Sequence, residues 1–418
     1  MSGHLHFKPA ITKLAKDSYI FVEGKPNADK FYIVKEGKVR IIRENEDLHG
    51  DILNPGDIFG TISVMAGHGY IMSAVAVTDV TLLVIDRKQY GDLVRKTNSI
   101  AMKNIKTFSV RMRELNDHLS ERMLKSSSTA DSSVLFDIAE YYENSQKINH
   151  AVYVYHQYLN NCPNGEKIEE AKQKLEKLQN YVSVDRPSYP ENTMMQKYPK
   201  ECLLFAEGEM GNNLYIIQSG SVKIIKIVNN QEIVLAVLGK SDIFGEMAML
   251  DDKPRAATAE IYEECTLLAV NKDNFSKLIH DQPDMVVKLT SMMAERLWLL
   301  YRQLDNTFIE EPIGRLFDAL IIQLEKNKVD LTSKDSYQCS FGYKELMGMA
   351  GLAVDRADGL YNKFLDTKKV LILEDKLQVN NVSETFKEAE YYRNMQKKEN
   401  SVRESKNKDK EKSATSEN

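Results

Sequence analysis

The stretch FVEGKPNADKFYIVKEGKVRII, Phe21 to Ile42, returns later in the chain as FAEGEMGNNLYIIQSGSVKII, Phe205 to Ile225. A shorter motif, DIFG, follows each stretch, at Asp57–Gly60 and again at Asp242–Gly245. Motifs that recur in the same order at nearly the same spacing indicate a duplicated domain, so we refer to a first copy and a second copy. The apolar runs in each copy are short, rich in β-branched residues and interrupted by glycine, which predicts short strands joined by tight turns.

The length and composition are typical of a globular protein with several domains. At roughly 150 residues per domain, a chain of 418 residues has room for about three units. Hydrophobic residues make up 42% and charged residues 28%, so most of the chain can form a buried core. Lys and Arg number 56 against 61 Asp and Glu, a net charge of −5, so any contact with DNA must rest on a local surface.

The cysteines and the apolar runs predict a cytoplasmic protein with no membrane contact. No Cys-x-x-Cys pair occurs, and no apolar run approaches the ~18 residues of a membrane span. The first residues, MSGHLHFKPA, do not resemble a signal sequence. The histidines do not cluster with carboxylates at metal-ligand spacing and no hydrolytic triad is evident, so we predict neither an enzyme nor a metal site.

Helical segments follow each copy and also join the two copies. Residues 101–122 and 284–304 have apolar residues every three or four positions, which predicts a long helix after each copy. The segment Ser132 to Gln179, between the copies, has residue spacings that resemble a tetratricopeptide repeat. We expect a helical spacer packed on its neighbours, and the alternative is a groove that binds a protein partner.

The C-terminal part of the chain predicts a winged helix followed by a tail. Pro312–Leu324 has a helical pattern, and Tyr343–Asp366 is typical of two helices that are separated at Gly351. Two short apolar strands about an Asp-Lys turn follow in VLILEDKLQVN. Beyond about Lys387 the chain alternates Lys, Glu, Asn and Ser with almost no apolar residue, which predicts disorder.

The segment FGEMAMLDDKPRAATA, Phe244 to Ala259, has the residue types of a phosphate-binding loop. Small residues let backbone amides approach an anion, and the guanidinium of Arg255 can bond phosphate oxygens with its planar fork. The carboxylate of Glu246 can accept hydrogen bonds from a sugar hydroxyl. The two residues at this spacing therefore indicate a site that binds both ends of a ribose phosphate.

This segment resembles the phosphate-binding cassette of cyclic nucleotide-binding domains, as in the regulatory subunit of the cyclic-AMP-dependent protein kinase and the catabolite activator (Crp/Fnr) proteins. The resemblance implies that Glu246 holds the ribose 2′-hydroxyl and that Arg255 holds the cyclic phosphate. The other positions implied to bind the ligand are Gly245, Met247, Ala248, Ala256 and Ala257. The ligand implied is cyclic AMP rather than cyclic GMP, because Ala256 stands where a family Thr or Ser can bond guanine.

The first copy lacks the residues that would bind a cyclic nucleotide. Its segment FGTISVMAGHGYIMSA places Thr61 where Glu246 stands and Tyr70 where Arg255 stands. A buried phosphate ester without a charged partner would lose several kcal/mol on the usual scale. We interpret this copy as a structural or dimerisation unit, and another ligand for it stays open.

The long helix of the second copy is expected to close the base site and to form a homodimer. The activator branch of the family has a Thr-Ser pair there, whereas this chain has Leu300 and Tyr301. Trp298 or Tyr301 could instead stack on the base as an aromatic lid, with core or dimer packing as the alternative. The expected homodimer contact runs along Val286 to Leu304.

The order of β-roll, long helix and winged helix is similar to the catabolite activator family, which implies DNA binding by analogy of fold. Lys344–Ala350 would be the first helix of the motif and Val354–Asp366 the recognition helix. That recognition helix has two basic and three acidic residues, and net acidity disfavours contact with phosphates. The candidate DNA contacts are Lys344, Arg356 and Lys363.

The sequence thus predicts an α+β multidomain fold: two β-roll (cupin-like jelly-roll) cyclic nucleotide-binding domains, a helical hairpin spacer and a C-terminal winged helix-turn-helix. The expected boundaries are 1–125 for the degenerate first domain with its helix, 126–185 for the spacer, 186–309 for the ligand-binding domain, 310–382 for the winged helix and 383–418 for the tail. The expected function is a cyclic-nucleotide-responsive transcription regulator. The alternative is an adaptor that binds the nucleotide and acts through protein contacts without DNA.

Overall fold

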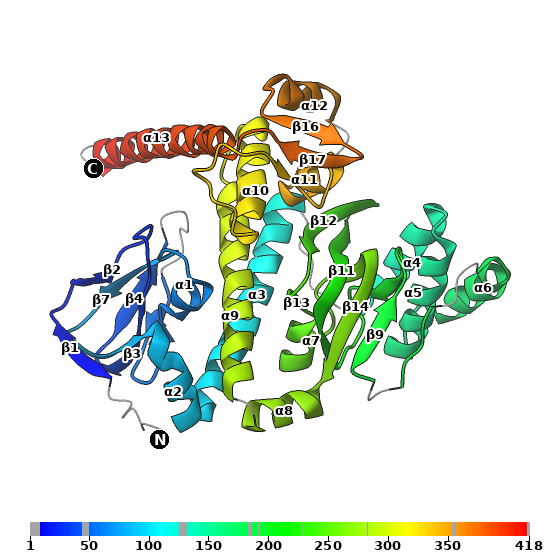
Figure 1. Cartoon of the computed structure of the whole chain (residues 1–418), viewed down its shortest axis with the longest axis horizontal. Coiled ribbons are helices and arrows are strands. Elements are labelled where there is room, and N and C mark those ends of the chain that lie inside the picture. The colour runs from blue at the N-terminus through cyan, green and yellow to red at the C-terminus, as the bar shows by residue number, and fades with distance from the viewer. Residues whose placement is uncertain are drawn as a thin grey trace. The chain divides into compact units, whose positions relative to one another are not determined.

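The computed structural model describes residues 9–43, 50–124, 132–182, 186–190, 193–228, 230–281, 283–352 and 357–415. The chain forms two compact units (Figure 1). Unit 1 comprises residues 1–117, 128–230 and 238–301, and unit 2 comprises residues 118–127, 231–237 and 302–418. Within the described ranges, no helix has the length and apolar character needed to cross a membrane.

The first copy consists of two small antiparallel sheets. One has the strand order β1 (Ala10–Leu14), β8 (Val80–Asp86), β3 (Lys30–Glu36), β6 (Ile58–Phe59). The other has the order β2 (Tyr19–Phe21), β7 (Ser73–Ala76), β4 (Val39–Ile42), β5 (Ile52–Leu53). Helix α1 (Thr61–Ala66) follows β6, and a 3-10 turn (Arg87–Gln89), α2 (Tyr90–Lys96) and α3 (Asn98–Leu124) follow β8. Apolar strand residues such as Phe31 and Leu82 are fully buried and supply the core.

The second copy repeats this pattern with longer strands. Its sheet has the order β10 (Leu203–Phe205), β14 (Thr258–Asn271), β11 (Asn213–Val228), with β9 (Met195–Tyr198) on β14 and β13 (Ile243–Phe244) on β11. Strand β12 (Gln231–Leu238) follows β11 along the chain. Helix α7 (Glu246–Asp251) follows β13, and α8 (Lys272–Asp281) and α9 (Pro283–Asn306) follow β14.

The DIFG motif has the same place in both copies. Tyr32 lies opposite Phe59 in the first copy, and Tyr215 lies opposite Phe244 in the second. The glycine that ends each motif is left-handed, with φ 80° at Gly60 and 77° at Gly245, and a short helix begins at the next residue. Because a side chain would strain this conformation, the turn from strand to helix requires glycine.

Helix α9 packs against the first copy inside unit 1, and Figure 1 shows it beside α3. The Tyr90 hydroxyl donates to Thr290 Oγ1 at 3.2 Å, and Arg111 Nε donates to the Tyr301 hydroxyl at 2.7 Å. The homodimer contact predicted through residues 286–304 would need this same part of α9. The homodimer contact stays a prediction, and it would compete with the contact between α9 and the first copy of the same chain.

The spacer between the copies is helical, with α4 (Val134–Asn144), α5 (Ile148–Asn161), α6 (Ile168–Leu178) and a 3-10 turn (Gln179–Tyr181). Its core is aromatic, with Phe136 packed edge-on against Tyr155 and Tyr158. The same core includes Leu203 and Ala206 of the second copy. The spacer therefore packs on its neighbour as expected, and its likeness to a tetratricopeptide repeat stays a prediction.

Unit 2 contains α10 (Pro312–Lys326), α11 (Tyr343–Met349) and α12 (Ala357–Asp366). A small antiparallel sheet accompanies them in the order β15 (Tyr337–Gln338), β17 (Lys376–Val379), β16 (Val370–Leu373). The β16–β17 hairpin turns at Glu374 and Asp375, which both have positive φ. The described helices and the two strands lie where the sequence predicted them, but the turn is formed by Glu374 and Asp375 and not by the predicted Asp-Lys pair, because Lys376 belongs to β17. The winged-helix assignment itself stays a prediction.

The prediction of a disordered tail from residue 383 is wrong for the described part of that segment. Helix α13 (Val382–Thr415) begins there and packs on α10. Ala389 and Gln396 are buried, and Arg393 forms an ion pair with Asp318 of α10. A Cβ on Gly314 of α10 would lie 2.6 Å from the ring of Tyr392. The helix is therefore ordered by a partner surface that its own composition does not reveal.

Candidate functional site

Arg255 lies against two glycines of the second copy. Its Nη1 donates to the carbonyl of Gly245 at 2.6 Å, and its guanidinium lies over the Phe205 ring at 4.2 Å. A Cβ added to Gly245 would lie 2.7 Å from this Nη1, and a Cβ added to Gly211 would lie 2.3 Å from the guanidinium of Arg255. Both positions therefore need to be glycine for the guanidinium to occupy this space.

The guanidinium of Arg255 is buried without full hydrogen bonding. The residue is 4% exposed, and burial lowers its pKa. Its Nε is buried and finds no hydrogen-bond partner among the described residues. An unmade hydrogen bond of a buried charged group costs about 1–3 kcal/mol or more, so this donor favours an incoming anion.

Glu246, the first residue of α7, is fully buried and is held by the long helix. Arg296 Nη1 on α9 lies 2.9 and 2.8 Å from its two carboxylate oxygens. Arg296 is a site residue that the sequence did not predict. The sequence places this arginine on the expected long helix, but its position in the sequence does not show which carboxylate the side chain contacts.

A second carboxylate, Glu209, supports the backbone around Arg255. Its Oε2 accepts from the backbone N–H of Ala206 at 3.0 Å and from the Tyr153 hydroxyl at 2.7 Å. Its carbonyl accepts from the backbone N–H of Arg255 at 2.8 Å. Burial raises the pKa of Glu209. This residue was also missed, since it belongs to the repeat but has no counterpart acid in the first copy.

Helix α3, which follows the first copy, contacts the cassette of the second copy. Arg113 binds both oxygens of Asp251 at 2.8 and 3.0 Å, and it also donates to the Pro254 carbonyl at 3.3 Å. Asn116 Nδ2 lies 3.8 Å from the sulfur of Met247. Both ends of the segment between Glu246 and Arg255 therefore contact the first copy.

The small residues expected at the ligand lie in the cassette. Met247 and Ala248 are buried on α7. Ala256 and Ala257 are half-buried in the turn between Arg255 and β14. The structure thus brings all seven candidate binding positions into the strand, helix and turn around Gly245.

In the first copy, Tyr70 occupies the position that Arg255 has in the second. Its ring stacks on Phe21 with 4.0 Å between centroids, as the guanidinium of Arg255 stacks on Phe205. Its hydroxyl donates to the Lys30 carbonyl at 2.5 Å, and burial raises its pKa. The first copy therefore fills this place with a neutral phenol.

The two candidate lid residues contact the first copy. Trp298 stacks on the ring of His68 with 3.8 Å between centroids, and Arg43 lies over the Tyr301 ring at 4.4 Å. Both residues are at most 5% exposed. The alternative of core packing accounts for these contacts, and the aromatic base lid stays a prediction.

The candidate DNA contacts differ in their surroundings. Lys344 is exposed on α11. Lys363 is exposed on α12, where its Nζ lies 3.0 Å from Glu311, and this hydrogen bond raises its pKa. Arg356 lies outside the described residues.

Comparison with known proteins identifies the kind of domain that both copies resemble. The family model described as "Cyclic nucleotide-binding domain" matches residues 11–97 and 195–282. A cyclic AMP receptor protein of Thermus thermophilus is 34% identical over 125 residues, which are 30% of this chain and 58% of that protein. The cAMP-activated global transcriptional regulator CRP of Salmonella typhimurium is 28% identical over 159 residues, 38% of this chain and 75% of that protein.

Among solved structures, a transcriptional regulator of the CRP/FNR family from Thermus thermophilus is similar at 16% identity. The alignment covers 47% of this chain and 98% of that chain with a TM-score of 0.39. This chain spans little more than half the length of the first curated relatives it matches. These matches show that the chain contains cyclic nucleotide-binding domain sequence and that part of it is similar to cAMP receptor and CRP-type regulators.

Proposed function

We propose that the second copy binds a cyclic nucleotide, cyclic AMP in preference to cyclic GMP. The observation that carries this proposal is the buried guanidinium of Arg255, whose Nε has no partner within the described residues. A cyclic phosphate oxygen would accept from that donor in a charge-assisted hydrogen bond. Glu246 would accept from the ribose hydroxyl, and Ala256 offers no hydroxyl to a guanine amino group.

Ligand binding would act on the long helices through Glu246 and Asp251. Glu246 is bonded to Arg296 of α9, and Asp251 is bonded to Arg113 of α3. A ribose hydroxyl that reaches Glu246 must share that carboxylate with Arg296. A ligand shifts the helices from one arrangement to another only if it binds the second arrangement more tightly than the first. These two ion pairs are where that difference in affinity would arise.

The first copy would serve as the partner of α9, in the place of a second subunit. His68, Tyr90 and Arg111 of the first copy each contact α9. Its own cassette position is occupied by Tyr70, so it would bind no cyclic nucleotide. On this proposal, one chain contains both the copy that binds the nucleotide and the surface against which helix α9 of that copy moves.

The output would be DNA binding by the C-terminal helices and hairpin, as in a transcription regulator. Lys344 and Lys363 are exposed, and exposed lysines can approach phosphates. The ion pair between Lys363 and Glu311 favours the second candidate, an adaptor that acts through protein contacts, because DNA would have to displace Glu311.

Calorimetric titration with cyclic AMP and cyclic GMP tests the ligand. We expect tighter binding of cyclic AMP, and no binding of either nucleotide would overturn the proposal. A mobility shift of genomic fragments with and without cyclic AMP separates the two outputs. A shift that depends on cyclic AMP supports a regulator, and binding of the nucleotide without any shift supports an adaptor.

A further inference from the structure

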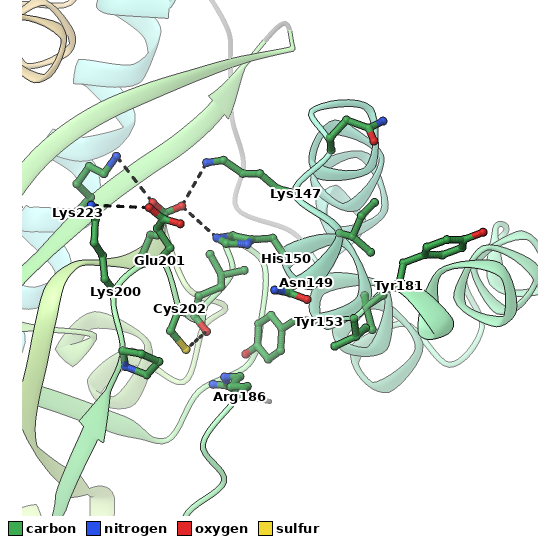
Figure 2. Close-up of a pocket in the computed structure, with 17 residues that line it drawn as sticks. Lys147, Asn149, His150, Tyr153, Tyr181, Arg186, Lys200, Glu201, Cys202 and Lys223 are labelled. Carbon is green, nitrogen blue, oxygen red and sulfur yellow. Dashed lines mark hydrogen bonds and ion pairs between the residues drawn. The ribbon is translucent and has the colours of Figure 1, made fainter. Parts of the chain in front are cut away.

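We propose that a second ligand site, for a phosphorylated small molecule, lies between the spacer and the second copy. A cavity of about 790 Å³ is found there, inside unit 1. Pockets of about 300–1,000 Å³ are the usual size for small organic ligands. Figure 2 shows that α5 and its flanking residues line one side and the second copy lines the other.

The cavity lining is rich in basic groups. The basic side chains are Lys147, His150, Arg186, Lys200 and Lys223. The acidic side chains are Glu201 and Glu260. Three of the basic side chains, Lys147, His150 and Lys223, pair with the same carboxylate, that of Glu260. Because the cations outnumber the carboxylates, the cavity favours an anion.

Glu260 shows where the positive charge is concentrated. Its carboxylate is within 3.4 Å of Lys147 Nζ, 3.2 Å of His150 Nε2 and 3.8 Å of Lys223 Nζ. Burial would raise the pKa of Glu260, but the hydrogen bond from His150 and the charges of the two lysines lower it to about 2. Two lysines and a histidine are therefore gathered at one point of the cavity lining, where a ligand's anionic group could approach them.

The start of helix α5 lies in the same cavity. Ile148 and Asn149, its first residues, both line the cavity. The amides of a helix's first turn have no acceptor within the helix, and this end carries partial positive charge. Val152 and Leu203 add apolar lining. Amides and ammonium groups beside apolar side chains suit a phosphate attached to an organic group.

The cavity is joined to the cassette by a chain of contacts. Tyr153 lines the cavity and donates to Glu209 at 2.7 Å, and the Glu209 carbonyl accepts from the backbone of Arg255 at 2.8 Å. Arg186, also in the lining, lies over the Tyr153 ring at 4.2 Å. An anion that moves Arg186 or Tyr153 would therefore change the support of Arg255. This coupling rests on the proposed cyclic nucleotide site, whereas the binding itself does not.

Calorimetry of the full chain with inorganic pyrophosphate and with ribose 5-phosphate, without cyclic nucleotide, tests the binding. We expect one pyrophosphate per chain, with affinity weakened about tenfold or more by Lys147→Gln with Lys223→Gln. Glu260→Gln should strengthen binding several-fold, because it removes the competing carboxylate, and misfolding cannot produce such a gain. Lys172→Gln, on an exposed pair of α6, should change nothing.

Three results would overturn the site. The first is no binding of either probe at millimolar concentration. The second is an affinity that is the same in the Lys147→Gln, Lys223→Gln double variant and in Glu260→Gln. The third is binding of a glutamate-rich peptide but of neither phosphate probe, which would assign the cavity to a protein partner.

The coupling is tested by titrating cyclic AMP with and without saturating pyrophosphate. We expect the affinity for cyclic AMP to change with pyrophosphate, and the affinity for pyrophosphate to change by the same factor with cyclic AMP. Tyr153→Phe, which removes the hydrogen bond to Glu209, should reduce that factor. If cyclic AMP fails to bind at all, the proposed function fails while the pyrophosphate titration still decides the second site.

Discussion

Arg296 of α9 lies across the carboxylate of Glu246, with its Nη1 2.9 and 2.8 Å from the two oxygens. The same nitrogen donates to the Ile243 carbonyl at 3.2 Å, just before the cassette. The side chain of Glu246 is 1% exposed, so Arg296 compensates a buried charge. The long helix is therefore bonded directly to the cassette.

Arg296→Ala should lower the free energy of unfolding by about 3 kcal/mol, because it leaves the buried carboxylate of Glu246 unpaired. Urea denaturation followed by circular dichroism measures the loss. The matched control is Arg95→Ala, which breaks the exposed pair with Asp284 and should cost at most about 1 kcal/mol. Equal losses of unfolding free energy in the two variants would show that the buried pair stabilises the protein no more than the exposed pair does.

Arg255→Ala should weaken cyclic AMP binding by about 1.5–3 kcal/mol or more, because a charged donor to the phosphate is lost. Titration calorimetry gives the affinity. Lys253→Ala, two residues away and exposed, is the control and should bind as the wild type does. Unchanged binding in Arg255→Ala would remove the cassette assignment.

Each chain should bind one cyclic nucleotide. Tyr70 fills the first copy's equivalent position and stacks on Phe21, so that position offers a phenol in place of a guanidinium. The calorimetric stoichiometry measures the number of sites. A value near two per chain, or one site that survives Arg255→Ala, would show that the first copy binds by another chemistry.

The stability of unit 1 should fall in acid because Glu260 is held ionised. Its pKa is lowered from 4.5 to about 2, so its ionisation stabilises the fold above pH 4.5 and this contribution is lost as the pH falls to 2. The contribution is about 3 kcal/mol at neutral pH. Urea midpoints of the wild type and Glu260→Gln between pH 6 and pH 2.5 measure it. Parallel curves for the two proteins would contradict the assignment.

The purified chain should be a monomer of 47.8 kDa by light scattering, because the first copy already covers part of α9. His68→Ala with Tyr90→Phe, which removes two of these contacts, should loosen the first copy from α9. A dimer of the wild type that is abolished by substitutions within residues 286–304 would restore the homodimer prediction.

Features set by neighbouring residues could be predicted from the sequence. Gly245 is required by a left-handed turn between adjacent elements, and Glu246 and Arg255 lie within one short segment. Aligning the two copies also shows the repeated strand pattern. The same alignment shows that Thr61 and Tyr70 replace the charged residues Glu246 and Arg255. Such features depend on spacings of a few residues, and local geometry fixes what those spacings can form.

The partners of these residues depend on packing between distant segments. Arg296 on α9 contacts Glu246, Arg113 of the first copy contacts Asp251, and the Trp298 ring stacks on His68. Helix α13 is ordered because α10 offers it a surface, although its own composition predicted disorder. A side chain's partner that lies fifty or more residues away in the sequence is selected by how whole elements pack, and the free energy of that packing is not contained in any local pattern.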